Sequence, residues 1–294
     1  MKARILQRKN FNKIIEKNTK LLLNNFCTFG SMELMKVKLA RLILGYFLLQ
    51  SIIIGACTYF FALSKYAFYA FFLFNVLWHF VIYFYLTSHT EAFFNTETAK
   101  KLDDINLANA VSLFRASSVM SVGFLIWNYE NRTVLIVAVC YAVVIFLSDA
   151  LDGLIARHAH ETTELGKMID SMSDYALLIF ISALFYEKEI LPLWFFILLF
   201  IRFFMQGYGM VKFISLGFPM APISTIGGKL TVAGTMLLYF FALLSLLVQN
   251  EFLTQCLHIG VIICAAVIFI FLFEKLFLFY RHYKVYRENK NTKK

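Results

Sequence analysis

Residues 148–175, SDALDGLIARHAHETTELGKMIDSMSDY, place four aspartates between long apolar runs. Asp149 and Asp152 are three positions apart before a short polar connection, and Asp170 and Asp174 are four positions apart after it. Side chains three or four positions apart lie on one face of an α-helix. A short connection makes two helices antiparallel neighbours. This stretch therefore predicts a helical hairpin whose two aspartate faces converge on one pocket.

The rest of the chain has the composition of a helical membrane protein. Hydrophobic residues make up 60% of its 294 residues, with 34 phenylalanines and three prolines, unlike a soluble globular domain. An apolar stretch of about 20 residues can span a bilayer as a helix. We therefore expect an all-α polytopic integral membrane protein, with six helices and a variable N-terminal pair as a close alternative to eight. The eight predicted spans are 40–63, 67–87, 110–129, 133–157, 166–186, 191–211, 226–248 and 255–280.

A polar segment at 88–109 separates the first two predicted helices from the other six. Residues 1–38 are basic and lack the apolar core and cleavage site of a signal peptide, so we expect them on an anionic membrane surface. We divide the remainder into an N-terminal transmembrane hairpin with its linker at 39–104, a six-helix membrane domain at 105–281, and a basic tail at 282–294.

The charges predict how the chain threads the membrane. The alternate loops SKY, NYENR, YEKEI and QNEFLT contain only Lys65, Arg132 and Lys188 as basic residues, and nearly all other Lys and Arg fall on the opposite side. By the positive-inside rule, both termini and the aspartates are expected in the cytoplasm, as in a bacterial inner-membrane protein. The net charge of +10 is then that of a basic membrane protein, and no nucleic acid is expected as a partner. The five cysteines have no paired spacing and predict neither a disulfide framework nor a zinc site.

Four carboxylates near hydrocarbon require an explanation. Each costs on the order of 2.5–3.5 kcal/mol at mid-bilayer and less near the edge, and the four repel one another. A bound cation removes this cost, and a site with only oxygen ligands favours Mg²⁺, Mn²⁺ or Ca²⁺. The small residues Gly153 and Ala156 leave room for a ligand to approach the helix backbone. Helix capping by water-facing aspartates would explain one or two of them, but not four on converging faces.

The same residues resemble the signature of the CDP-alcohol phosphotransferase family, also named CDP-alcohol phosphatidyltransferases. The pattern D-x2-D-G-x2-A-R-x8-G-x3-D-x3-D is matched at every fixed position. The resemblance extends less closely over about 105–281: NLANAVSLFR resembles the start of the family's first core helix, and GGKLT, residues 227–231, resembles the start of its fifth. The eight matching positions are Asp149, Asp152, Gly153, Ala156, Arg157, Gly166, Asp170 and Asp174.

The resemblance implies a homodimeric membrane enzyme with a six-helix catalytic core at 105–281. Such an enzyme cleaves the pyrophosphate of a CDP-linked alcohol, joins one phosphoryl group to a second alcohol and releases CMP. It implies two divalent ions, Mg²⁺ or Mn²⁺, held by the four aspartates, with Asp174 as the general base for the acceptor hydroxyl. It also implies a CDP-alcohol site made by Asp149, Gly153, Ala156, Arg157 and Gly166.

The donor expected from this resemblance is CDP-diacylglycerol, and the acceptor is a small polar alcohol. Arg115, Arg202 and Lys229 are candidates for binding the acceptor. Arg202 and GGKLT favour glycerol 3-phosphate, whereas Ser171 resembles the serine- or inositol-type branches. A CDP-choline or CDP-ethanolamine aminoalcohol phosphotransferase that uses diacylglycerol is the alternative within the class.

Outside the class, intramembrane carboxylates also occur in cation-coupled transporters, which show internal repeats and broken helices at the bilayer midplane. Neither feature is evident here. An inactive scaffold would be expected to have lost one of the aspartates.

Overall fold

The structure is a computed structural model that describes residues 33–291, except for 97, 99–101, 103, 160–161 and 216–225. Most of the predicted N-terminal segment and the last residues of the predicted tail lie outside the described residues. The structure also does not describe several side chains within the helices, among them those of Asp152, Ala156 and Arg157.

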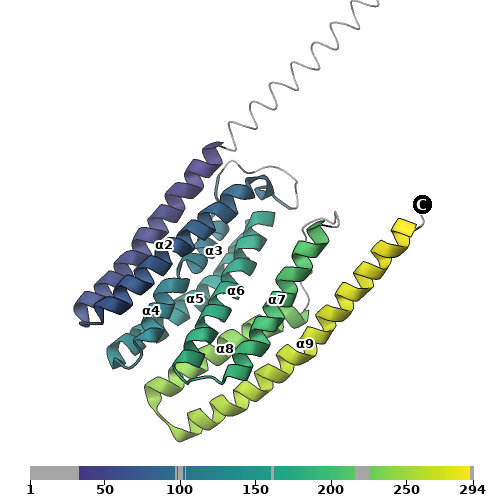
Figure 1. The fold of residues 1–294 in the computed structure, drawn as a ribbon. Coiled ribbons are helices and arrows are strands. Elements are labelled where there is room, and N and C mark those ends of the chain that lie inside the picture. The colour runs from purple at the N-terminus through teal and green to yellow at the C-terminus, as the bar shows by residue number, and fades with distance from the viewer. Residues whose placement is uncertain are drawn as a thin grey trace, which may run out of the picture.

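The described chain folds into helices with no strand, which confirms the all-α prediction (Figure 1). Among the described residues, seven helical stretches are long and apolar enough to cross a membrane, with α3 and α4 together forming one of them, Leu107–Trp127. The apolar part of α7, Leu193–Gly209, is shorter. The first helix, Glu33–Phe60, carries no label in Figure 1. It is followed by α2 (Lys65–Ser88), the 3₁₀ helix η1 (Thr90–Ala92), α3 (Leu107–Ser117), α4 (Val119–Trp127), α5 (Arg132–His158), α6 (Glu164–Glu187), α7 (Leu193–Ser215), α8 (Ile226–Val248) and α9 (Glu251–Asn291).

The predicted helix at 110–129 is two helices, α3 and α4, which meet at Ser118. Serines compete with the helix for backbone hydrogen bonds, and three of them lie at the break, in ASSVMS, residues 116–121. The carbonyl of Ala116 accepts a hydrogen bond of 2.7 Å from the Trp78 indole of α2. A neighbouring helix thus satisfies a backbone group at the break.

The two N-terminal helices pack on this break through a polar network. Gln50 donates to the Ser118 hydroxyl at 3.2 Å and accepts a hydrogen bond from Ser121. The Tyr141 hydroxyl of α5 lies 2.8 Å from Gln50 Oε1 and 2.9 Å from Ser118 Oγ. Gln50 is fully buried, so this network joins the N-terminal pair to α4 and α5 inside the bundle.

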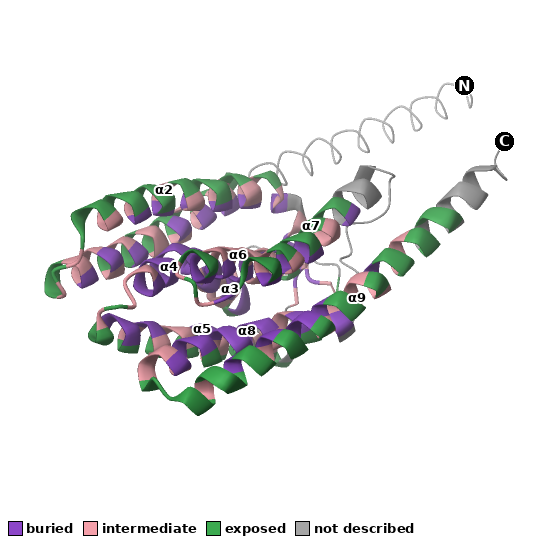
Figure 2. Ribbon diagram, turned by 60° about the horizontal axis from the view of Figure 1, so that its bottom comes forward, coloured by how far each residue is buried: buried purple, intermediate pink, exposed green. Residues whose placement is uncertain are grey.

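Burial places α3 and α4 at the centre of the bundle (Figure 2). In the apolar stretch of Leu107–Trp127, 78% of the residues are buried, against 22% in Glu33–Phe60 and 22% in Glu251–Arg281. The outer helices therefore present apolar side chains outward. A helix whose exposed face is apolar is suited to contact lipid.

Candidate active site

The hairpin of α5 and α6 brings aspartates from both helices together at one end of the bundle. Asp149 lies near the end of α5, and Asp170 and Asp174 lie in the first half of α6. One carboxylate oxygen from each of the three lies within 4.8 Å of the others. The structure thus joins three of the four aspartates singled out by their spacing. The side chain of the fourth, Asp152, is among those not described.

Arg115, at the end of α3, lies in the middle of this aspartate cluster. Its guanidinium is fully buried and contacts Asp149 at 2.8 Å, Asp170 at hydrogen-bonding distance, and Asp174 at 3.5 Å. Its Nε also donates to the Ser173 hydroxyl at 3.0 Å. Arg115 was expected to bind the acceptor, and the structure places it against the carboxylates. Its role toward the acceptor stays a prediction.

The cluster has the ligand chemistry of a divalent-cation site. The Arg115 guanidinium offsets one of the three negative charges, and the ligand atoms that the described residues bring together are all carboxylate oxygens. The side chains of Asp149 and Asp170 are 42% and 46% exposed, whereas that of Asp174 is 14% exposed. Oxygen ligands with excess negative charge fit a hard cation such as Mg²⁺ or Mn²⁺. Asp149 and Asp170 are thus open to a ligand that approaches from this end, and Asp174 lies deeper.

The start of α6 is fixed by a contact with the start of α3. The hydroxyl of Thr163 accepts a hydrogen bond from the Gly166 N–H at 2.9 Å and donates to Asn109 Oδ1 at 3.0 Å. A Cβ atom at Gly166 would lie 2.3 Å from Asn109 Oδ1. Gly166 therefore permits the close approach of the two helices that carry Arg115 and Asp170. Gly166 was expected to bind the CDP-alcohol, and that expectation also stays a prediction.

The other predicted basic residues differ in their surroundings. Arg202 of α7 is buried, with 1% of its surface exposed, and donates to Gln206 at 3.0 Å. Gln206 in turn donates to the hydroxyl of Tyr175, the residue that follows Asp174. This chain of contacts connects Arg202 to the neighbourhood of the aspartate cluster. Lys229 lies at the start of α8 and is exposed.

Sequence reasoning missed two charged residues of α9, Glu274 and Lys275. Lys275 is 5% exposed, and Oε2 of Glu274 is buried. The run FIFLFEKLFLFY was interpreted only as part of a span. The signal was present, because ionisable residues inside a spanning segment are rare and usually functional.

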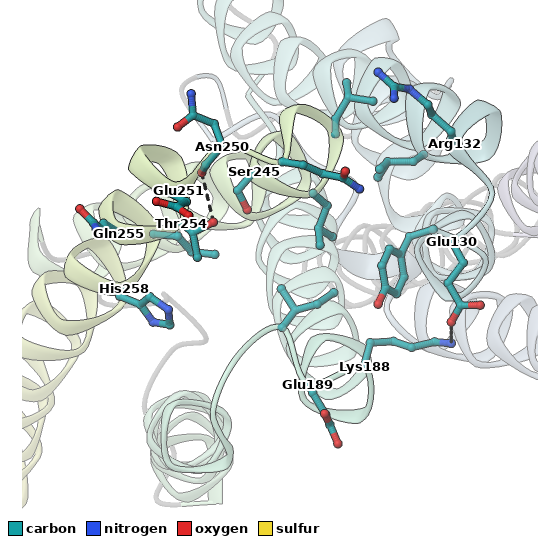
Figure 3. A pocket seen from close by; sticks show the side chains of 17 residues that line it. Glu130, Arg132, Lys188, Glu189, Ser245, Asn250, Glu251, Thr254, Gln255 and His258 are labelled. Carbon is teal, nitrogen blue, oxygen red and sulfur yellow. Dashed lines mark hydrogen bonds and ion pairs between the residues drawn. The ribbon is translucent and has the colours of Figure 1, made fainter.

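A cavity of about 810 Å³ lies at the other end of the bundle (Figure 3). Arg132, at the start of α5, and Lys188, after α6, are among its lining residues, and Lys188 lies 3.5 Å from Glu130. Arg132 and Asp149 are about 25 Å apart along α5, at 1.5 Å per helical residue. None of the residues predicted to act in the reaction lines this cavity.

An all-α membrane protein with carboxylates from two helices at one end suits metal-assisted chemistry on phosphate esters. The family model described as CDP-alcohol phosphatidyltransferase matches residues 105–274, more than half of the chain. The chain therefore belongs to the CDP-alcohol phosphatidyltransferase family. Membership supports a transferase that uses a CDP-alcohol, embedded in a membrane. No curated protein and no solved structure matches the chain.

Proposed function

We propose that this protein transfers a phosphatidyl group from CDP-diacylglycerol to the hydroxyl of a small polar alcohol and releases CMP. The observation that carries the proposal is the convergence of Asp149, Asp170 and Asp174 within 4.8 Å at one end of the α5–α6 hairpin. The chain's membership of the family supports it. We assign this chemistry to the predicted six-helix domain at 105–281.

Asp174 is the proposed general base. In the reaction, the acceptor hydroxyl oxygen bonds to the phosphorus that bears diacylglycerol, and the bond from this phosphorus to the bridging pyrophosphate oxygen breaks. CMP leaves with that oxygen, and the acceptor proton passes to the Asp174 carboxylate. Asp174 is the most buried carboxylate of the three, which suits a group that must receive a proton away from bulk water.

Asp149, Asp152, Asp170 and Asp174 are the proposed ligands of two divalent ions, Mg²⁺ or Mn²⁺. Such ions, when bound, neutralise the charge on the pyrophosphate and make the acceptor hydroxyl more acidic. Arg115 holds three of the carboxylates in one place. It thereby keeps the proposed ligands close together despite their mutual repulsion.

The donor's cytidine diphosphate is proposed to bind beside Asp149, along Gly153, Ala156, Arg157 and Gly166. The Nδ2 of Asn109 supports this position. It is buried without a hydrogen-bond partner among the described residues, and its side chain lies against Gly166. A nucleotide oxygen there would satisfy a donor that is costly to leave unpaired.

The acceptor is proposed to bind near Arg202, with Arg115 and Lys229 as further candidates. The sequence patterns make glycerol 3-phosphate, serine and inositol the candidate acceptors. We further propose that both termini and the aspartate cluster face the cytoplasm, and that the enzyme is a homodimer. Light scattering of the purified protein in detergent tests the dimer.

The experiment that tests the proposed function is CMP release by purified protein with CDP-diacylglycerol and Mg²⁺ or Mn²⁺. Glycerol 3-phosphate, serine, inositol and inositol phosphate are supplied one at a time. We expect release to require one of them and the metal ion. Asp174→Asn should lower kcat by about 10²–10⁴-fold, the usual contribution of a general base.

Absence of CMP release with every acceptor contradicts the proposal. The same assay with CDP-choline or CDP-ethanolamine and diacylglycerol then tests the aminoalcohol phosphotransferase. If that assay also fails, a cation-coupled transport assay in proteoliposomes tests the remaining alternative.

A further inference from the structure

Two adjacent charges lie inside the apolar part of α9. Lys275 is 5% exposed, and Glu274 is partly buried with an Oε2 that has no hydrogen-bond partner among the described residues. A charged side chain within a spanning helix is costly unless it meets another charge, a polar cavity or a ligand. Oε2 of Glu274 therefore calls for a polar counterpart on a neighbouring helix.

The counterpart on α7 is Arg202. Helices α7 and α9 pack against each other (Figure 1), and Arg202 lies within electrostatic range of both Glu274 and Lys275. One guanidinium nitrogen of Arg202 is bonded to Gln206, but its Nε has no partner in the described part of the chain. A buried donor and a buried acceptor thus lie within electrostatic range of each other, and neither satisfies the other.

The groups Arg202, Glu274 and Lys275 form what we call the α7–α9 charge cluster, and it adjoins the proposed base. Gln206 links Arg202 to the hydroxyl of Tyr175, and Tyr175 follows Asp174 in the sequence. On its other side the cluster meets the start of α8, because a Cβ at Gly227 would lie 2.5 Å from Glu274 Oε2. The cluster therefore lies between α7, α8 and α9, beside the residue that would activate the acceptor hydroxyl.

The charges of the cluster define what can bind there. Arg202 and Lys275 are two buried cations, and the Glu274 carboxylate offsets only one of their two charges, so an anion would neutralise the cluster. The unpartnered Nε of Arg202 requires a hydrogen-bond acceptor, and the unpartnered Oε2 of Glu274 requires a donor. Each of these two buried groups is costly to leave without a partner.

We propose that the α7–α9 charge cluster recognises the groups of the acceptor alcohol that do not react. This inference rests on the proposed function. Arg202 and Lys275 bind an anionic group, a carboxylate or a phosphate, and Glu274 accepts a hydrogen bond from an adjacent ammonium or hydroxyl group. The acceptor is therefore an anionic alcohol with a second hydrogen-bond donor. Inositol, which has no anionic group, and ethanolamine, which has only a cationic one, do not fit.

The test measures the KM of the acceptor and of CDP-diacylglycerol in Lys275→Met and Glu274→Gln. Loss of the Lys275 charge should raise the acceptor KM about tenfold or more, because a charge-assisted hydrogen bond is lost, while the donor KM changes less than about twofold. Methionine suits an apolar helix surface, so this variant should keep its fold. Glu251→Gln, at the exposed start of the same helix, is the matched control and should leave the acceptor KM unchanged.

Glu274→Gln distinguishes the two kinds of anionic acceptor. If the acceptor has an ammonium group there, as serine does, that group loses its counter-charge and the acceptor KM should rise about tenfold. If the acceptor has a hydroxyl group there, as glycerol 3-phosphate does, a neutral hydrogen bond remains and the acceptor KM should rise less than about threefold. The inference is overturned if inositol or ethanolamine is the best acceptor, or if Lys275→Met leaves the acceptor KM within twofold of the parent. In both cases CMP is still released, so the proposed function stands; if no acceptor gives CMP, the proposed function itself fails.

Discussion

At the scale of single residues, Arg115 determines the shape of the aspartate cluster. It is fully buried and contacts a carboxylate on α5 and two on α6. Because three carboxylates so close together repel one another, the guanidinium and a bound metal ion should stabilise the same arrangement. The stability of the folded protein is then expected to depend more strongly on the metal ion when the guanidinium is removed.

Replacement of Arg115 by Gln should therefore lower the stability of the metal-free protein by about 1.5–3 kcal/mol, the range for a lost hydrogen bond to a charged group. Mn²⁺ should restore part of the loss. The measurement is thermal denaturation in detergent, with EDTA and with Mn²⁺, beside Lys65→Gln as an exposed control. An unchanged melting temperature in EDTA would show that Arg115 does not hold the cluster.

Gly166 gives a second prediction at this scale. A methyl group there would lie 2.3 Å from Asn109 Oδ1 and 2.8 Å from Thr163 Oγ1, so Gly166→Ala must displace the start of α6 or of α3. We expect a loss of about 1–3 kcal/mol, typical of overpacking, together with weaker Mn²⁺ binding because Asp170 is displaced. The control is Gly234→Ala in α8, where the added Cβ has nothing within 4 Å. Equal stability of the two variants would contradict this account of Gly166.

At this scale, the sequence predicts the position of a side chain where helical spacing alone determines it. The positions of Asp149, Asp170 and Asp174 on converging faces could be predicted, because helical periodicity and a short loop determine them. The surroundings of Arg115 could not, because its carboxylate partners lie on two helices that follow later in the chain. Glu274 was missed for another reason: its apolar neighbours dominated the interpretation of the segment.

At the scale of helices, the bounds of six of the eight predicted spans agree with the structure within four residues. The first helix begins seven residues before its predicted start, α9 ends eleven residues after its predicted end, and the break at Ser118 was not predicted. The stretch at 110–129 contains four serines and Arg115 among its apolar residues, but no proline that would mark a helix end. At the break, Trp78 and Gln50, from an earlier part of the chain, donate hydrogen bonds to the Ala116 carbonyl and the Ser118 hydroxyl. Long-range contacts of this kind cannot be inferred from a local pattern.

Gln50→Leu tests how strongly the N-terminal pair is joined to the core. The change leaves the hydroxyls of Ser118, Ser121 and Tyr141 without their shared amide partner. We expect a loss of about 1–3 kcal/mol, since buried polar groups are orphaned. Chemical denaturation in detergent measures it, with Gln255→Leu, an exposed residue of α9, as the control. No difference between the two variants would mean that the network contributes nothing to stability.

At the scale of the whole molecule, the account predicts which side of the membrane each end faces. The Arg132 end of α5 should lie outside and the Asp149 end inside, because positive charge concentrates on the aspartate side. In a cysteine-free background, Glu130→Cys should react with an impermeant maleimide on intact cells. Asn291→Cys should react only after permeabilisation. The reverse labelling pattern would contradict the orientation and place the aspartates on the outer side.

Metal-dependent phosphatidyl transfer at the aspartate cluster is tested by the ratio of CMP to new phospholipid formed from CDP-diacylglycerol. The purified protein is supplied with Mn²⁺ and the acceptor that gives CMP release, and the lipid product is identified by mass spectrometry. We expect one phosphatidyl-linked acceptor for each CMP, with both products lost in EDTA and in Asp149→Asn, and both retained in Glu251→Gln. CMP without a new phospholipid, or equal formation of both products in EDTA, would contradict a metal-dependent phosphatidyl transfer at the aspartate cluster.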